Sequence, residues 1–314
     1  MNLPSEKIYK KISKIEDKYT RELFKNYRMA LDDIRDILAK LYEKQGDLTW
    51  AEMAKYNRMS KLQDEISKIL GPTFSKNVNL IKRLQTAEYG QSFFMHCWAV
   101  DNGYKVRLNW GLLSRKAIEK AVENPLLKIA EGRLRQDGRT KIRRAITQGL
   151  IRGDGYPQMV SSVRDAIDGN RADALRILRT EGQRAAVMGQ QAQAEESRRL
   201  GIDIIERWDA TLDSKTRPRH GEMDGQVKKE GGFYSPGIGW FPGPLQSNVA
   251  SFDINCRCSV DEELPDDPPV IRQDQERGEA IPNTTFSKWA KENDLTVNKY
   301  GQVYYDRKFT NKGD

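Results

Sequence analysis

Hydrophobic residues recur every three or four positions along roughly the first forty residues. This spacing predicts one apolar stripe on a helix of about ten turns, because residues three and four apart share a helix face. A helix of this length needs a partner to cover the stripe, in the same chain or in another. The stripe consists of Ile8, Ile12, Ile15, Tyr19, Leu23, Tyr27, Leu31, Ile34, Leu38 and Leu41.

Turn and capping signals divide the rest of the first hundred residues. Gly46-Asp47 predicts the end of the first helix, and Thr49-Trp50-Ala51-Glu52 has the pattern of a capping box that opens a second. Gly71-Pro72 predicts the end of that helix, and a third is expected up to the turn Asp101-Asn102-Gly103. We therefore expect a helical hairpin or small bundle over residues 1–100, serving as a stalk, a docking surface or a self-association element.

Shorter helices are predicted over residues 101–200, because turn-forming pairs interrupt the helical pattern. The last and most strongly predicted helix is expected from about Arg171 to Leu200. The predicted breaks are Asn124-Pro125, Asp137-Gly138, Gly153-Asp154-Gly155 and Gly169-Asn170.

The pattern changes to short strands and loops after residue 200. Ile202 to Trp208 is β-branched and aromatic, which predicts a strand, and Val249 to Val260 is expected to form a further strand or tight turn. A stretch rich in Gly and Pro separates the two. Residues 201–260 are thus expected to form a small, loop-rich α+β module, and the fold class of the whole chain is α+β.

The last part of the chain is expected to be a linker followed by a short tail. Residues 261–285 are acidic and Pro-rich, which is typical of a linker. In the tail, residues 286–314, a brief helix is predicted around Trp289 and a strand at Val303-Tyr304-Tyr305. We find no internal repeat.

Charge is unevenly distributed along the chain, whose net charge is +8. Residues 133–184 hold 12 Lys and Arg against 6 Asp and Glu, which makes +6, whereas residues 259–281 hold 8 acidic against 2 basic residues, which makes −6. This asymmetry fits contact with a polyanion or charge-matched docking to a protein, and it also fits solvated helix faces. The candidates for non-specific, salt-sensitive contact with double-stranded DNA are Arg139, Lys141, Arg143 and Arg144.

Composition and missing motifs exclude several function classes. Every uncharged stretch is far shorter than the roughly 18 apolar residues of a membrane span, and the charged N-terminus lacks the apolar segment of a signal peptide. Three cysteines without an export signal suit synthesis in a reducing cytosol. The Gly-rich and aromatic stretch 232–243 lacks the Gly-Lys-Ser/Thr of a phosphate loop and is better interpreted as an aromatic docking loop. We find neither an HExxH motif nor a Ser/His/Asp order.

One histidine and two cysteines form the clearest candidate for a metal site. Cys256 and Cys258 are two residues apart, so on a strand their side chains project to the same side. With His220 they supply three ligands suited to Zn²⁺, and Asp224 or Asp213 could supply a fourth. Two alternatives stay open: buried thiols with a hydrogen-bonded imidazole, and a strained disulfide between the two cysteines.

Polar residues around the candidate ligands are expected to stabilise the loops. Asp213 and Thr216 can bond back to the backbone in turns, Gly225 can adopt a φ that other residues resist, and an Arg–Asp pair involving Arg217 could lock the long loop to the core. On the preceding helix, Arg179 and Glu181 are expected to pair internally rather than to contact DNA.

The order of these residues resembles the signature of the Mu F-like phage head-morphogenesis family. The resemblance covers about residues 110–260 and is strongest over 176–259. It comprises the helix residues Arg179-Thr180-Glu181 and Arg184, then Trp208, Asp213 with Thr216-Arg217, His220 with Asp224-Gly225, and Asn255-Cys256-Arg257-Cys258.

The resemblance implies a minor capsid component of the virion, made in the bacterial host cytoplasm and located inside the head. Family members associate with the portal protein, with capsid or scaffold proteins and with packaged DNA, and this chain could leave the head with the genome. Some relatives carry a toxin domain after this module. Only about fifty residues follow Val260 here, fewer than most enzyme domains need, so no toxin domain is expected.

Two other functions compete with this interpretation. The first is a metal-dependent nuclease of the His-Asn type, with His220 as the base near Asn255. That chemistry usually employs additional histidines, and this module contains one. The second is a nucleic-acid-binding module without a phage role, which the basic window permits although no DNA-reading motif is present. We therefore expect no catalysis.

Overall fold

The computed structural model describes residues 5–45, 53, 57–111, 113–265, 269–293, 295–297 and 303–305. The predicted turn at Gly46-Asp47 and the capping box at 49–52 lie outside them. The chain divides into two compact units, each assembled from separate segments. Lys14–Leu84 and Glu123–Glu181 form one unit, here called the bundle unit. Met1–Ser13, Gln85–Val122 and Gly182–Asp314 form the other, here called the mixed unit.

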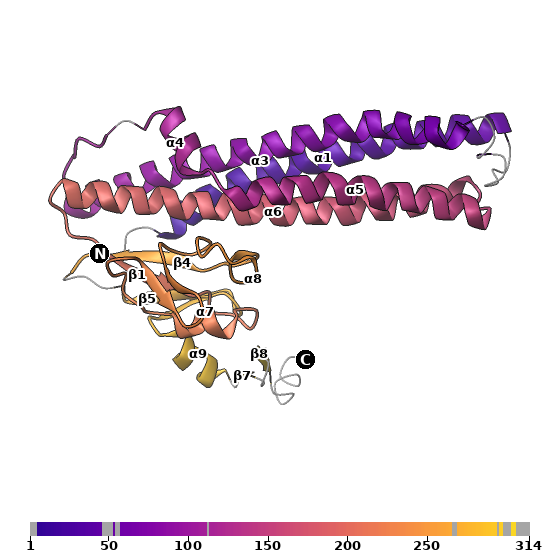
Figure 1. Cartoon of the computed structure of the whole chain (residues 1–314). Coiled ribbons are helices and arrows are strands. Elements are labelled where there is room, and N and C mark those ends of the chain that lie inside the picture. The colour runs from indigo at the N-terminus through magenta and orange to yellow at the C-terminus, as the bar shows by residue number, and fades with distance from the viewer. Residues whose placement is uncertain are drawn as a thin grey trace. The chain divides into compact units, whose positions relative to one another are not determined.

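Among the described residues, four long helices supply the bundle unit, and Figure 1 shows their segments within this unit lying side by side. They are α1 (Ser5–Gln45), α3 (Arg58–Tyr104), α5 (Pro125–Arg152) and α6 (Tyr156–Arg199). All ten residues of the predicted stripe on α1 are buried or half-buried, which confirms the amphipathic helix. Buried hydrophobic residues on the other three helices of the bundle unit include Leu70, Phe74 and Ile81 of α3, Ile142 and Ile146 of α5, and Val163 and Ile167 of α6.

Three predicted breaks are wrong, because helices run through them: α3 continues through Gly71-Pro72, α5 through Asp137-Gly138, and α6 through Gly169-Asn170. The helix end predicted at Asp101-Asn102-Gly103 differs by a few residues, since α3 ends at Tyr104. The breaks at Asn124-Pro125 and at 153–155 are confirmed.

Tertiary packing explains why turn-forming residues stand inside helices. A Cβ on Gly138 would lie 2.6 Å from the Phe74 ring and 2.7 Å from the side chain of Asn170, so only glycine lets α5 approach this closely. Asn170 is fully buried, yet its amide is satisfied: it accepts a 2.6 Å hydrogen bond from Tyr27 Oη and donates one of 3.0 Å to the Leu134 carbonyl. The buried contacts therefore override the local turn preference.

The mixed unit combines helix ends with four small antiparallel sheets, which confirms the α+β class. Its helical parts are the start of α1 and the ends of α3 and α6, together with α4 (Arg115–Ala121), α7 (Pro218–Glu222), α8 (Ala250–Asp253) and α9 (Phe286–Glu292). Its sheets pair β1 (Ile205–Asp209) with β4 (Ser259–Glu263), β2 (Phe233–Ser235) with β3 (Gly239–Phe241), β5 (Ile271–Asp274) with β6 (Glu279–Pro282), and β7 (Leu295–Val297) with β8 (Val303–Tyr305).

The sheet formed by β1 and β4 carries the predicted strand after residue 200. Trp208 lies opposite Val260 in its register, and both side chains are buried. The predicted strand or turn at 249–260 is a composite, because it contains α8, a turn and only the start of β4.

The segment predicted as a linker contains regular structure. Residues 271–282 form the β5–β6 hairpin, with Arg272 opposite Ile281. The following helix, α9, confirms the helix expected around Trp289, and β8 confirms the strand at Val303-Tyr304-Tyr305. Phe286 and Trp289 of α9 are buried in the same core cluster as Trp208. The tail thus contributes to the core of the mixed unit.

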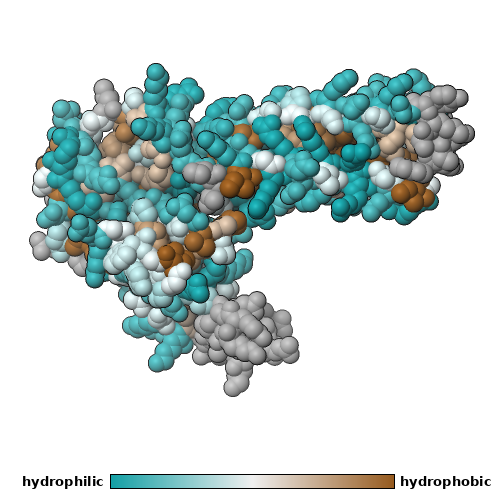
Figure 2. All heavy atoms as spheres, viewed as in Figure 1, coloured by the Kyte–Doolittle hydropathy of each residue, from teal (hydrophilic) through white to brown (hydrophobic). Residues whose placement is uncertain are grey.

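The surface of the protein is largely hydrophilic, as expected from a sequence rich in charged residues. Figure 2 shows hydrophilic residues covering most of the bundle helices on the face in view, with hydrophobic ones scattered among them. Across the described residues, none of the helices combines the length and the apolar character needed to span a membrane.

Candidate functional site

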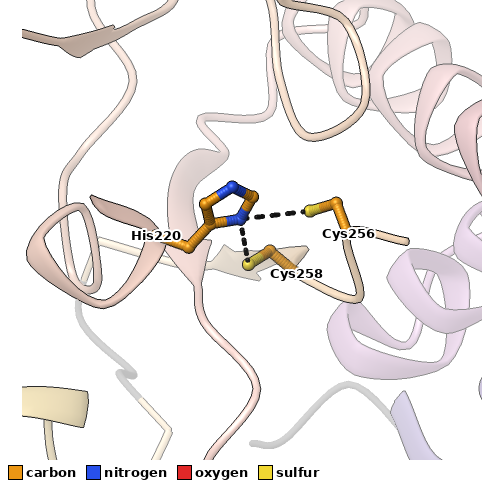
Figure 3. A group of neighbouring side chains, drawn as sticks. All are labelled: His220, Cys256 and Cys258. Carbon is orange, nitrogen blue, oxygen red and sulfur yellow. Dashed lines mark hydrogen bonds between the residues drawn. The ribbon is translucent and has the colours of Figure 1, made fainter. Parts of the chain in front are cut away.

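His220, Cys256 and Cys258 converge inside the mixed unit, although 36 residues separate the histidine from the first cysteine. The imidazole Nδ1 lies 3.4 Å from Cys256 Sγ and 3.3 Å from Cys258 Sγ. The three ligand atoms all lie within 4.8 Å of one another, and all three residues are buried. Figure 3 shows the two sulfurs turned toward the same edge of the imidazole. Both cysteines are free thiols.

Short local elements position the three side chains. Pro218 begins α7, where its missing N–H costs nothing because the first N–H groups of a helix have no partner within the helix. The same short helix carries His220. The cysteines lie in the extended segment between α8 and β4 rather than on the predicted strand. Extended backbone has the same alternation, so both thiols face one side while the Arg257 side chain faces another.

Aromatic rings surround the imidazole. The rings of His220 and Phe252 are 4.1 Å apart, and Trp208 meets His220 edge-on with ring centroids 6.1 Å apart. Trp208 also packs edge-on against Phe233 and Phe241. The three donor atoms therefore lie in an apolar environment, in which an unbalanced charge would be costly.

The two thiols differ in acidity because they interact with each other. A hydrogen bond from Cys258 lowers the pKa of the Cys256 thiol well below its usual value, and His220 lowers it further. Burial, reinforced by the neighbouring Cys256, raises the pKa of the Cys258 thiol well above its usual value.

Asp213 holds the cysteine segment in place through Arg257. The Arg257 guanidinium contacts both carboxylate oxygens of Asp213, at 2.8 Å for Nη2 and Oδ1, and Thr216 Oγ1 donates to the same carboxylate. Burial raises the pKa of Asp213, but the Arg257 guanidinium more than offsets this effect. The pKa of Asp213 is therefore below its usual value. The Arg–Asp lock expected from the sequence therefore uses Arg257, which lies between the two cysteines, rather than Arg217.

Asp224 lies outside the ligand cluster. Its carboxylate accepts hydrogen bonds from Ala210 N at 2.7 Å and Phe286 N at 2.6 Å, and it forms a two-pronged ion pair with Arg272. Because all of these contacts occupy the carboxylate, the structure does not support Asp224 as a fourth metal ligand. Asp213 is likewise occupied by Arg257.

The remaining signature residues shape the loops. Arg217 donates to the carbonyls of Ser251 and Phe252 at 2.7 Å each, which ties α7 to α8. Gly225 adopts a φ of +77° and its N–H donates to the Trp208 carbonyl at 2.9 Å. Asn255 adopts a φ of +57° in the turn before Cys256, a conformation that asparagine tolerates better than most residues.

Three glutamines of α6, which were not predicted from the sequence, bind backbone carbonyls of the module. Gln183 donates to Cys258 O at 3.2 Å, Gln190 to Val260 O at 2.7 Å and Gln191 to Pro242 O at 2.8 Å. Their spacing of seven and eight residues along one helix face is the signal that could have identified them.

The predicted helix and DNA-contact residues lie in the bundle unit. Arg179 pairs with Glu16 at 3.0 Å, and Glu181 accepts a hydrogen bond from Asn124 at 2.8 Å. The four candidates for DNA contact, Arg139, Lys141, Arg143 and Arg144, are all exposed on α5. Lys141 pairs with Asp173 at 3.2 Å.

Comparison with known proteins points to phage heads. The family described as "Phage Mu protein F like protein" matches residues 140–261, which include all three members of the cluster. Over 275 residues the chain is 30% identical to the minor head protein GP7 of Bacillus phage SPP1, an overlap that covers 83% of this chain and 88% of GP7. No solved structure matches the chain.

Two bacterial proteins are also similar. A protein of Enterococcus faecalis named NAD(+)–arginine ADP-ribosyltransferase EFV is 29% identical over 273 residues, which is 85% of this chain but 56% of that protein. An uncharacterized protein of Haemophilus influenzae is 24% identical over 143 residues, which is 44% of this chain and 29% of that protein.

Proposed function

The chain belongs to the Mu F-like family of phage minor head proteins, and we propose that it works inside the head as a non-catalytic component bound to the portal protein and to packaged DNA. Membership of this family makes it a virion component with a role in head morphogenesis, associated with other capsid components. The single observation that carries this function is the 30% identity to GP7 across 88% of that protein.

A structural role rather than a catalytic one fits the use of the signature residues. The carboxylates of Asp213 and Asp224 are both held by arginines, and the side chains of Thr216 and Arg217 bond to backbone carbonyls. A catalytic acid or base needs a carboxylate that is available to the substrate. These groups instead fasten loops to the core.

The relative named as an ADP-ribosyltransferase is consistent with this proposal. The match covers 85% of this chain but leaves 44% of that protein unmatched. We assign the transferase activity of that protein to its unmatched part, and the shared part to a head-protein module. Recombinant chain incubated with NAD⁺ and arginine-containing acceptor proteins should then transfer no ADP-ribose.

Contact with the portal protein would use the β2–β3 hairpin. Tyr234 and Trp240 face each other across this hairpin with ring centroids 5.3 Å apart, and they are 43% and 53% exposed. Exposed aromatic pairs of this kind are typical anchors of protein interfaces. The hairpin lies in the stretch interpreted above as an aromatic docking loop.

A pull-down against the portal protein of the same genome tests the proposal. We expect portal binding that survives high salt and nuclease treatment, and weaker binding by the Tyr234→Ala/Trp240→Ala double variant. Val270→Ala, another exposed hydrophobic position of the same unit, is the matched control. Absence of portal binding by the folded wild-type chain would remove the portal from the proposal.

A further inference from the structure

We propose that His220, Cys256 and Cys258 bind one Zn²⁺ ion, which fastens the cysteine segment to α7. Imidazole nitrogen and thiolate sulfur are the ligands that zinc prefers in proteins. The three residues come from two segments of the chain, so a shared ion would link them directly. This inference concerns the stability of the module and does not depend on the proposed contacts with portal or DNA.

The separations of the donor atoms fit tetrahedral coordination. A tetrahedral Zn²⁺ with Zn–S bonds of about 2.3 Å and Zn–N bonds of about 2.0 Å places nitrogen and sulfur about 3.6 Å apart. The two Nδ1–Sγ distances are 3.4 and 3.3 Å. Insertion of the ion therefore requires each Nδ1–Sγ separation to grow by only a few tenths of an ångström.

The orientation of the imidazole also favours a ligand role. Nδ1 faces both sulfurs, while Nε2 is buried and has no hydrogen-bond partner among the described residues. A neutral imidazole protonated at Nε2 directs the Nδ1 lone pair at the point between the sulfurs, where a cation would lie.

Charge balance suits the apolar surroundings. Two thiolates and one neutral imidazole balance the two positive charges of Zn²⁺, so the filled site would carry no net charge. The rings of Trp208 and Phe252 lie against the site, and an uncompensated thiolate there would be costly. Zn²⁺ would thus neutralise the charge of the two buried thiolates.

The backbone around the ligands is already fixed by hydrogen bonds. Cys256 N donates to Asp253 O at 3.0 Å, and Cys258 O accepts from Gln183. Between them, Arg257 is locked by Asp213, and its carbonyl accepts from Thr211 Oγ1 at 2.8 Å. Preorganised ligands of this kind lose little freedom on binding a metal.

The fourth coordination position of the ion is assigned to a water molecule. The carboxylates of Asp213 and Asp224 are already bound by Arg257 and Arg272.

Metal analysis of the full chain tests the proposal. Wild-type protein purified in the presence of Zn²⁺ and then desalted should retain one zinc per chain, measured by inductively coupled plasma mass spectrometry. The variants His220→Gln and Cys256→Ser/Cys258→Ser should lose it. Cys97→Ser and His96→Gln remove a buried cysteine and a buried histidine outside the cluster, and these controls should keep it.

Cobalt supplies a readout that does not depend on the folding of the variants. Co²⁺ added to the folded wild-type chain should produce the visible absorption of tetrahedral cobalt and a near-ultraviolet thiolate-to-metal band. A helical wild-type chain that takes up neither zinc nor cobalt would overturn the proposal, as would a Cys256–Cys258 disulfide in most of the purified chain. Zinc retention by the cysteine double variant would overturn it as well.

Discussion

Arg272 and Asp224 form a buried ion pair in which two guanidinium nitrogens contact two carboxylate oxygens, at 2.8 and 2.7 Å. The Asp224 side chain is 1% exposed and that of Arg272 is 11% exposed. The pair joins the β5–β6 hairpin to the signature loop. A segment with the composition of a linker is therefore fastened to the core of the mixed unit.

Removing the arginine should destabilise the mixed unit strongly. Arg272→Ala leaves the Asp224 carboxylate buried without its counter-charge, which typically costs about 3–5 kcal/mol. Urea unfolding monitored by tryptophan fluorescence measures the loss. Arg115→Ala, at an exposed arginine of the same unit whose partner Glu119 is exposed too, is the control and should change stability by less than about 1 kcal/mol. Equal effects of the two substitutions would contradict the role assigned to Arg272.

Replacing each of two glycines of α5 by alanine should change the stability of the protein in opposite directions. Gly138→Ala places a Cβ against Phe74 and Asn170, so we expect a loss of about 1–3 kcal/mol from overpacking. Gly132 is exposed, and a Cβ added there would meet no heavy atom within 4 Å, so Gly132→Ala should stabilise by about 0.5–1 kcal/mol. Thermal unfolding by circular dichroism distinguishes the two, and a stabilising Gly138→Ala would refute the close-packing argument.

The bundle shows which part of the fold is predictable from the sequence. The stripe from Ile8 to Leu41 identified α1, because helical periodicity is a local property of the chain. Gly138 and Asn170 carried an equally clear turn signal, yet both lie inside helices. The contacts that override this signal come from residues far away in sequence, such as Tyr27, which binds Asn170. Local preference cannot reveal such contacts.

The cluster of His220, Cys256 and Cys258 was predictable from the sequence, but the contacts of the nearby carboxylates were not. The two-residue spacing of Cys256 and Cys258, and the suitability of thiol and imidazole groups for Zn²⁺, pointed to three residues that do converge in the structure. The partner of Asp224 could not be predicted, because Arg272 lies in a stretch whose proline and acidic residues indicated a linker. Composition does not reveal a tertiary ion pair.

His96 should make stability depend on pH. Burial lowers the pKa of His96 to about 4 from the usual 6.5, despite a hydrogen bond with the Ser92 carbonyl. As the pH falls from 6.5 to 4, the unfolded chain binds a proton that the folded chain does not, so the free energy of unfolding decreases by about 3 kcal/mol from this group. Above pH 6.5 the stabilisation is complete.

The substitution His96→Gln tests this pH dependence. Urea unfolding at several pH values between 4 and 6.5 should show a shallower decrease for the variant than for the wild-type chain. Because carboxyl groups titrate in the same range, the difference between the two proteins is the quantity to compare. Parallel curves would show that His96 does not contribute to the pH dependence.

The basic residues of α5 should govern DNA retention. Arg143 and Arg144 are exposed and have no ion pair with any described residue, so they can contact phosphates. Arg143→Gln/Arg144→Gln should weaken binding to double-stranded DNA of any sequence and reduce the slope of log K against log salt by about 2. Fluorescence anisotropy at several salt concentrations measures both. The control, Arg21→Gln/Arg28→Gln, removes the same charge from exposed positions of α1, and an equal loss there would indicate a bulk charge effect.

Quantitative mass spectrometry of gradient-purified heads, from the genome that encodes this chain, tests whether the chain is a minor component of a phage head. We expect it to be present at a few copies per head, far fewer than the major capsid protein, and to remain after nuclease and high-salt washing. Purified heads that lack the chain would show that it is not a head component.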